Sequence, residues 1–150
     1  MPAGETQIRE IRASDRPRWN ALWAGYLEFY REDLPQDMTE LTWQRLMDPA
    51  EALLGFAALS GDQMIGFVHY HFHLSTWSAA GNCYLEDLFV DPNTRGNGAG
   101  RALIEAVYRA ADARGVKRVY WHTQETNRQA RVLYDKVAEL TDFVRYQRKP

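Results

Sequence analysis

The sequence predicts a single α/β domain with a mixed central sheet. Short apolar segments typical of strands alternate with segments whose apolar residues recur every three or four positions, as they do in amphipathic helices. A glycine-rich loop follows one of the strand-like segments and runs directly into a helical one. The 150 residues suffice for one hydrophobic core, so one domain is expected over residues 1–150.

The first third of the chain predicts one strand and two helices. Residues 7–12 alternate isoleucine imperfectly with charged residues, which indicates a short strand. A Ser-Asp pair precedes residues 18–31, whose apolar residues have helical spacing. Thr39 is a suitable N-cap for a second helix over residues 40–47, which an Asp-Pro pair ends. The largely aromatic face of the first helix consists of Trp19, Leu22, Trp23, Tyr26, Phe29 and Tyr30.

The remainder of the chain predicts five strands and two helices. Residues 60–63, Ser-Gly-Asp-Gln, form a hairpin signal between two apolar runs, and Gly115 stops the helix that follows the glycine loop. The expected elements are strands over residues 53–59, 64–74 and 85–90, a helix from the loop to about residue 113, a strand over 118–122, a helix over 128–136 and a final strand over 143–147.

The loop over residues 95–100, Arg-Gly-Asn-Gly-Ala-Gly, indicates an anion site. The first N–H groups of a helix have no partner within it and lie at the positive end of its dipole, and glycines let phosphate oxygens approach. An ordinary flexible turn is the alternative. A nucleoside triphosphatase loop is excluded because Arg101 and Ala102 follow the last glycine in place of lysine and a hydroxyl residue. The glycine spacing also differs from a dinucleotide fingerprint.

The composition of the chain narrows the classes of function that are expected. The formal net charge is -2 and the charged residues are mixed along the chain, so no field for nucleic acid or an anionic membrane is expected. A single cysteine, Cys83, cannot form an internal disulfide, which suits a reducing compartment. No apolar run approaches the length of a membrane span, and the N-terminal residues lack a signal pattern. A cytoplasmic protein is therefore expected.

Two segments carry a family resemblance. Arg95, Gly98 and Gly100 match the pattern R-x-x-G-x-G, and the segment from Asn127 to Tyr134 matches N-x-x-A-x-x-L/F-Y. Together they resemble the GCN5-related N-acetyltransferases. The Tyr-Leu-Glu-Asp segment over residues 84–87 is similar to the spermidine/spermine (diamine) acetyltransferases, and the C-terminal part to the yeast histone and polyamine acetyltransferases.

The resemblance implies a fold, a cosubstrate and its contacts. The fold would be a mixed sheet of about six to seven strands with flanking helices and one splayed strand pair. The cosubstrate would be acetyl-CoA, with no metal. Its pantetheine arm would pair with the strand that precedes the loop, and the loop would hold the pyrophosphate. The residues implied in cofactor binding are Leu88, Phe89, Val90, Arg95, Gly96, Asn97, Gly98, Ala99, Gly100, Arg101, Asn127 and Tyr134.

Glu86 is the candidate general base. An amine with a lysine-like pKa is almost all ammonium at neutral pH, which costs roughly 4 kcal/mol unless a base takes the proton. Alternation along a strand predicts that Glu86 and Asp87 face opposite sides of the sheet. In the diamine branch the position that matches Glu86 contacts the substrate amine through water. The alternative is that both acids are solvated groups at a strand end.

Tyr134 is the candidate general acid. The resemblance implies that its hydroxyl points at the coenzyme A sulfur and protonates the leaving thiolate, although a tyrosine beside Leu133 on a helix face is also typical of a core. Asn127 combines an N-cap position with an implied cofactor contact. After Tyr134 the family usually continues with a glycine, whereas this chain has Asp135, which leaves the path of the last turn open.

Other polar residues bear on the acceptor. Glu28 and Tyr30, near the end of the first helix, are the expected substrate-binding residues together with Glu86, because acids and aromatic rings recognise a cationic amine. A solvated helix face is the alternative. His69, His71 and His73 share one strand face, where a polar wall of the acceptor cleft is favoured over a metal site. Cys83 is expected to be a small buried residue and not a nucleophile.

These observations predict an acetyl-CoA-dependent N-acetyltransferase. The expected acceptor is a small-molecule primary amine, polyamine-like ahead of a protein lysine or an amino acid, which attacks directly in a ternary complex. A homodimer is expected by resemblance, with no nucleic-acid or membrane partner. The alternative is a non-catalytic acyl-CoA binding or sensing module, which would need the loop but neither Glu86 nor Tyr134.

Overall fold

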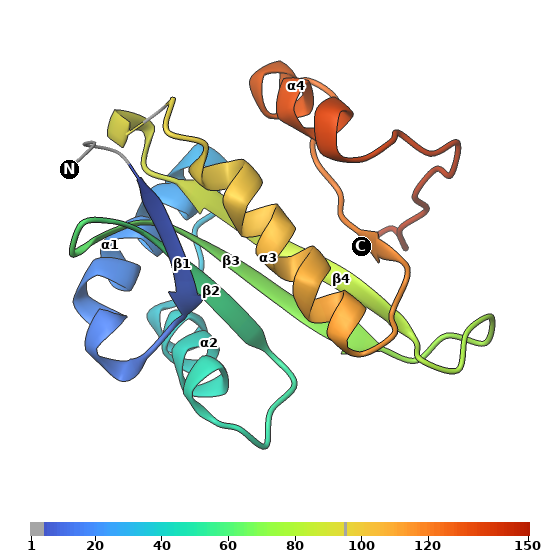
Figure 1. Ribbon diagram of the computed structural model, residues 1–150, viewed down its shortest axis with the longest axis horizontal. Coiled ribbons are helices and arrows are strands. Elements are labelled where there is room, and N and C mark those ends of the chain that lie inside the picture. Colours follow the sequence, from blue (N-terminus) through green and yellow to red (C-terminus); the bar gives the residue numbers. More distant parts are fainter. Residues whose placement is uncertain (1–4, 95) are drawn as a thin grey trace.

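The computed structural model describes residues 5–94 and 96–150 and shows a five-stranded sheet flanked by helices (Figure 1). The strands are β1 (Thr6–Glu10), β2 (Leu54–Ser60), β3 (Gln63–His73), β4 (Asn82–Val90) and β5 (Val119–Tyr120). The helices are α1 (Arg16–Phe29), α2 (Gln36–Met47), α3 (Ala99–Ala113) and α4 (Arg128–Val137), with short 3-10 turns at Ala13–Asp15 and Pro92–Thr94.

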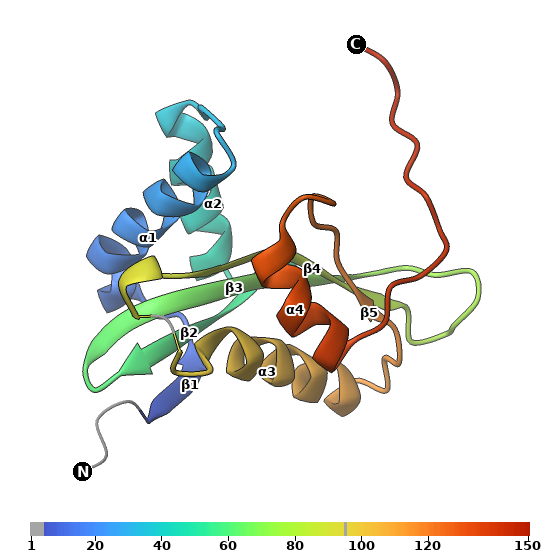
Figure 2. The same ribbon diagram turned by 90° about the horizontal axis from the view of Figure 1, so that it is seen from above.

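The sheet is mixed, as predicted. Its strands follow the chain order, with β1 to β4 joined as antiparallel neighbours and β5 parallel to β4. α1 and α2 cover one face and α3 the other (Figure 2). α4 packs beside α3, where the Tyr108 hydroxyl donates a 2.9 Å hydrogen bond to the Val137 carbonyl.

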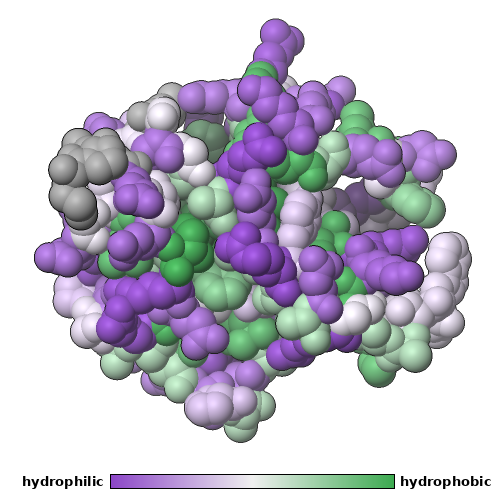
Figure 3. All heavy atoms as spheres, viewed as in Figure 1, coloured by the Kyte–Doolittle hydropathy of each residue, from purple (hydrophilic) through white to green (hydrophobic). Residues whose placement is uncertain are grey.

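The core has one part on each face of the sheet. Under α3, residues such as Leu103, Ile104 and Val107 pack on Val68 and Leu85. On the other face the predicted aromatic stripe of α1 is buried: Trp19, Leu22 and Trp23 pack with Trp43 of α2 and Phe67 of β3. The surface shown in Figure 3 mixes hydrophilic side chains with scattered apolar ones, in keeping with charges spread along the chain. Within residues 5–94 and 96–150, no helix has the length and apolar character to cross a bilayer.

Several predicted boundaries differ from the observed ones. β4, predicted from residue 85, begins at Asn82. α2 begins at Gln36 and not at residue 40, because Pro35 takes the N-cap position and Asp37 supplies a favourable charge in the first turn. The strand predicted over 118–122 is limited to Val119 and Tyr120.

The predicted final strand over residues 143–147 does not form, so the sheet has five strands and not six to seven. Phe143 and Val144 are each 76% exposed and Tyr146 is 94% exposed. A strand needs a neighbouring edge, and the two-residue β5 offers too short a ladder for these residues to extend. Figure 2 shows the segment after α4 leaving the body of the domain.

Candidate active site

The glycine loop and the start of α3 form the candidate phosphate site. Gly98 is the N-cap of α3 with φ +74°, and Gly96 has φ +87°. A Cβ at either position would meet no atom within 4 Å, so the backbone conformation, and not space, requires glycine here. The loop is held by a 3.1 Å hydrogen bond from the Ala99 N–H to Asn97 Oδ1. Thr6 Oγ1 of β1 also donates to the Asn97 carbonyl, at 3.3 Å. Arg95, predicted to take part, lies outside the described residues.

The third glycine of the loop serves close packing. A Cβ on Gly100 would lie 3.3 Å from Leu133 Cδ2 of α4 and 3.9 Å from Val90 Cγ2 of β4. Gly100 therefore lets the first turn of α3 approach Leu133 of α4, whereas the distance to β4 would be an ordinary contact. Arg101, on the exposed side of this turn, forms a 2.8 Å ion pair with Glu105.

β4 and β5 separate soon after they meet. Their parallel pairing joins Cys83 with Val119 and Tyr84 with Tyr120, and within residues 5–94 and 96–150 no further pair continues the ladder. From Leu88 to Val90, β4 is paired with β3 on its other edge. The predicted splayed pair is thus confirmed, and it leaves main-chain groups of Leu88, Phe89 and Val90 without a strand neighbour on the β5 side.

A β-bulge places Glu86 and Asp87 on the same face, so their predicted placement on opposite faces was wrong. His69 of β3 lies opposite Asp87, but the next residue, Tyr70, lies opposite Leu85. Glu86 is the extra residue between them. Because one unpaired residue reverses the alternation of a strand, both carboxylates face the side that α1 and α2 cover.

The two carboxylates line a cleft of about 410 Å³ between α1, α2 and the sheet. Glu86 keeps solvent access, yet the cleft walls desolvate its carboxyl group. That desolvation, and next the neighbouring Asp87, raise the pKa of Glu86, while His71, His69 and His122 act in the opposite direction. A raised pKa suits a carboxylate that must accept a proton from an ammonium. The lining residues are Trp23, Leu34, Met38, Thr42, Arg45, Glu51, Ala52, Leu53, His71, Glu86 and Asp87.

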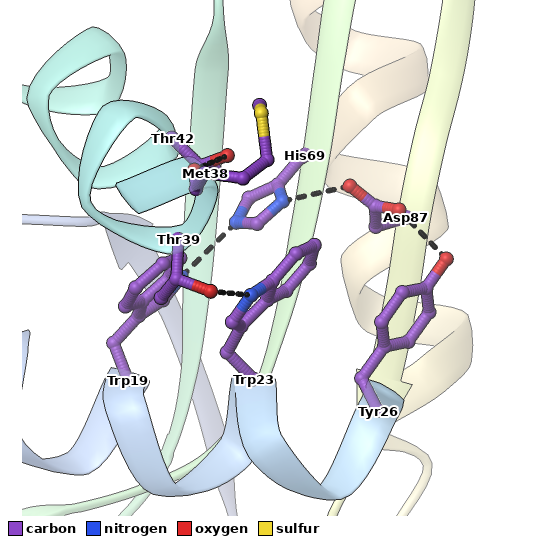
Figure 4. A network of polar contacts seen from close by, with 8 residues as sticks. All are labelled: Trp19, Trp23, Tyr26, Met38, Thr39, Thr42, His69 and Asp87. Atoms are coloured by element: carbon purple, nitrogen blue, oxygen red, sulfur yellow. Dashed lines mark hydrogen bonds and ion pairs between the residues drawn. The ribbon is translucent and has the colours of Figure 1, made fainter. Parts of the chain in front are cut away.

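A hydrogen-bond chain leads from the buried Trp19 and His69 to the partly buried Asp87 (Figure 4). Trp19 Nε1 donates to His69 Nε2 at 3.1 Å, and Asp87 Oδ2 lies 3.0 Å from His69 Nδ1. An indole nitrogen can only donate, so Nε2 is the acceptor and Nδ1 carries the proton that Asp87 accepts. The Tyr26 hydroxyl donates to Asp87 Oδ1 at 2.6 Å. Both oxygens of Asp87 are thereby held by side chains of α1 and β3.

His69 is therefore a core residue and not part of a partly exposed polar wall. It is completely buried, whereas His71 lines the cleft. His73, further along β3, lies 2.8 Å from the Tyr120 hydroxyl. No group of three or more His, Cys, Asp and Glu side chains in the described part of the chain is arranged to hold a metal. Sequence spacing gave no signal for the Trp19–His69 contact, because its partners lie 50 positions apart.

Tyr134 lies on α4 with its ring against Trp121, 5.4 Å between ring centroids. Burial, and next the nearby Tyr30, raise the pKa of Tyr134 to about 12. Tyr30 in turn packs on Tyr26, whose hydroxyl holds Asp87. Neither Tyr134 nor the predicted acceptor residue Tyr30 is among the residues that line the cleft.

The other predicted residues are placed as follows. Glu28 is exposed on α1 and is not among the residues that line the cleft. Asn127 occupies the N-cap position of α4, but its side-chain amide donates to Thr123 Oγ1 at 3.0 Å instead of capping the helix. Cys83 is fully buried, and burial raises the pKa of its thiol to about 11, which does not suit a nucleophile.

The fold and the site define an α/β protein with a glycine-rich helix start at one end of β4 and an acid-lined cleft at the strand's bulge. Comparison with known proteins gives the family. Residues 19–138 match the model of the Acetyltransferase (GNAT) family, so the chain belongs to that family and is an N-acetyltransferase. The predicted family is thereby confirmed.

Curated relatives and solved structures agree with this assignment. D-amino-acid N-acetyltransferase HPA3 of Saccharomyces cerevisiae is 40% identical over 94% of this chain and 89% of its own length. The thialysine N-epsilon-acetyltransferase of Bos taurus is 34% identical over 57% of this chain and 49% of its own. The aminoglycoside acetyltransferase AAC(6')-Iy, solved with a bisubstrate analogue, has a TM-score of 0.82 at 22% identity, covering 97% of this chain and 99% of that one, and supports the fold.

Proposed function

We propose that this enzyme transfers the acetyl group of acetyl-CoA to a small primary amine by direct attack within a ternary complex. The observation that carries the proposal is the position of Glu86. It is the unpaired residue of the β4 bulge, faces the cleft, and stands in the strand that leads to the glycine loop. A proton acceptor and a phosphate-binding loop are thus joined by a single strand.

Acetyl-CoA fits the groups at the far end of β4. The N–H groups of the loop and of the first turn of α3 suit its pyrophosphate. The free edge of β4 suits the amide groups of its pantetheine arm, which would add to the sheet as a short strand. The residues assigned to this contact are Leu88, Phe89, Val90, Arg95, Gly96, Asn97, Gly98, Ala99, Gly100, Arg101, Asn127 and Tyr134.

In the proposed reaction the neutral amine nitrogen attacks the thioester carbonyl carbon. Glu86 first accepts the ammonium proton, directly or through water. The C–N bond then forms, the C–S bond breaks, and the proton that the attacking nitrogen loses replaces the one that Tyr134 gives to the sulfur. The cleft position of Glu86 and the raised pKa of its carboxyl group support this role. Placing amine and thioester side by side supplies the rest of the acceleration.

Tyr134 supplies the proton for the departing thiolate. Its raised pKa, about 12, keeps the hydroxyl protonated at neutral pH, as a general acid requires. An ordinary thiol has a pKa of about 8.5, so the proposed proton transfer from this phenol takes place together with cleavage of the C–S bond.

We place an amino acid ahead of a polyamine as the acceptor, which reverses the order expected from the sequence. The relative at 40% identity is named for D-amino acids, and the thialysine enzymes are named for an amino acid side-chain amine. Glu86 and Asp87 provide negative charge for the amine of either class.

The proposal is tested by the release of free coenzyme A thiol from acetyl-CoA with a panel of D- and L-amino acids, thialysine, spermidine and a lysine-rich peptide. Release with one class of acceptor establishes the activity and the substrate class together. If acetyl-CoA binds but no acceptor of the panel supports release, the proposed acceptor classes are wrong.

We also propose that the chain forms a homodimer in the cytoplasm. The support for the dimer is the apolar surface after α4, where Leu140, Phe143, Val144 and Tyr146 are 76–94% exposed. A second copy would cover these side chains. Light scattering of the full chain and of a chain ending at residue 138 tests the dimer. The full chain should have twice the monomer mass and the shortened chain the monomer mass; a monomeric full chain would contradict the proposal.

A further inference from the structure

Arg45 is a cation in the acceptor cleft that the proposed chemistry does not use. It lies in the last turn of α2, is exposed, and lines the cleft together with Glu86 and His71. Within residues 5–94 and 96–150, no carboxylate forms an ion pair with its guanidinium. The arginines of this part of the chain that are paired with acids are Arg9, Arg16, Arg18 and Arg101.

The cleft carries both signs of charge on different walls. Glu86 and Asp87 come from β4, while Arg45 comes from α2. Glu51, in the segment before β2, also lines the cleft, but it forms no ion pair with Arg45. Two charges of opposite sign that face one cavity and do not neutralise each other match a ligand that itself carries both charges.

We propose that Arg45 binds the carboxylate of an amino acid acceptor whose amine lies at Glu86. This inference rests on the proposed function and extends it to the second charged end of the acceptor. A guanidinium presents paired N–H donors whose geometry matches a carboxylate. The cleft volume of about 410 Å³ is within the range of small-molecule sites.

The same charge selects against the other acceptor class. A polyamine whose first amine lies at Glu86 would direct a second ammonium along the cleft toward Arg45, where like charges repel. An amino acid directs a carboxylate there. Arg45 is thus a specificity-determining residue that attracts one class of acceptor and disfavours the other.

A purely structural role for Arg45 predicts a different result. A cation in the last turn of a helix interacts favourably with the helix dipole, and its loss lowers stability by a small amount. That effect does not depend on whether the acceptor bears a carboxylate. The comparison of acceptors with and without this group therefore separates the two roles.

The experiment measures kcat/KM for an amino acid and for its amide, which has the same side chain but no negative charge, in the wild type and in Arg45→Gln. The amide has a less basic amine, so the informative quantity is the change in the amino acid to amide ratio between the two proteins. We expect Arg45→Gln to lower kcat/KM for the amino acid by about 10- to 100-fold. The amide should be affected little, and spermidine should become a better acceptor.

Two matched variants control the result. Arg45→Lys keeps the charge but loses the paired donors, and should retain part of the preference. Arg109→Gln removes an exposed arginine of α3, outside the lining of the cleft, and should leave both acceptors unchanged. An equal loss for amino acid and amide in Arg45→Gln, or no loss for either, would overturn the assignment.

A series of ω-amino acids measures the distance between the amine site at Glu86 and the carboxylate site at Arg45. Glycine, 4-aminobutyrate and 6-aminohexanoate place the carboxylate at increasing distance from the amine, and the acceptor most damaged by Arg45→Gln reports the span from Glu86 to Arg45. Turnover of spermidine but of no amino acid would overturn the role of Arg45 while the acetyltransferase proposal stands. Absence of turnover with every acceptor would overturn both.

Discussion

Nδ1 of His69 donates a 3.0 Å hydrogen bond to Asp87, between two neighbouring strands and next to the cleft that Glu86 lines. The direction of this hydrogen bond follows from the tautomer of His69. The indole of Trp19 donates to the other ring nitrogen, Nε2, so the proton of the ring is on Nδ1. Asp87 is consequently held as an acceptor beside Glu86. It stands there as a fixed negative charge next to the candidate base.

Removal of that charge should move the pH dependence of the reaction. Desolvation, and next the charge of Asp87, raise the pKa of Glu86. Asp87→Asn removes the second cause, so the pKa of Glu86 should fall and Glu86 should lose its proton at a lower pH. We expect the acidic limb of the kcat/KM profile to shift toward lower pH. The maximum should be reduced, because the amide keeps one acceptor oxygen and either Tyr26 or His69 loses its hydrogen-bond acceptor. Asp62→Asn in the exposed β2–β3 turn is the control. An unshifted acidic limb would remove Asp87 from the electrostatics of the site.

Glu86→Gln should lower kcat/KM at neutral pH by about 10²- to 10⁴-fold, the range for loss of a general base. The defect should diminish at high pH, where more of the amine is already neutral. Acetyl-CoA affinity, measured by calorimetry, should stay unchanged. Full activity of this variant at neutral pH would mean that a different group, or water alone, accepts the proton.

Tyr134→Phe should lower turnover with little loss of acetyl-CoA affinity, because it removes the proton donor and keeps the ring. The pKa of Tyr134 is raised from 10.0 to about 12, so the wild-type rate should show no loss from Tyr134 ionisation up to about pH 10. Tyr108→Phe is a matched control, since its hydroxyl bonds only the Val137 carbonyl among the described residues. That variant should lose stability and keep kcat. Equal turnover in the Tyr134 variant and the wild type would exclude Tyr134 as the acid.

Gly98→Ala should weaken acetyl-CoA binding. Residue 98 has φ +74°, and a non-glycine residue in this region costs about 1–2 kcal/mol, so the loop would shift away from its phosphate-binding form. Gly61→Ala provides a control of the same kind, because Gly61 has φ +60° in the β2–β3 turn and open space around it. Both variants should lose similar thermal stability, but only the first should lose affinity for acetyl-CoA. A similar affinity in both would argue against the loop as the phosphate site.

The sequence predicted the parts of this enzyme that are local. Hydrophobic periodicity located the aromatic face of α1, and the glycines identified the loop before α3. The base at Glu86 and the acid at Tyr134 followed from family motifs and remain predictions. What sequence could not predict depends on pairing between distant segments. The bulge at Glu86 is a property of the register with β3, and the contact of Trp19 with His69 joins a helix to a strand. Arg45 enters the cleft only because α2 packs beside the sheet.

The bulge at Glu86 divides β4 into two halves that are out of phase. Before it, even-numbered side chains such as Tyr84 face the cleft side, and after it odd-numbered ones such as Asp87 and Phe89 do. The phase change is set by the number of residues in the strand and not by their identity. Substitutions at position 86 can therefore alter the chemistry while the frame of the site persists. Deletion of one residue at the bulge would move the side chains of one half of β4 to the opposite faces of the sheet, even if every remaining residue were kept.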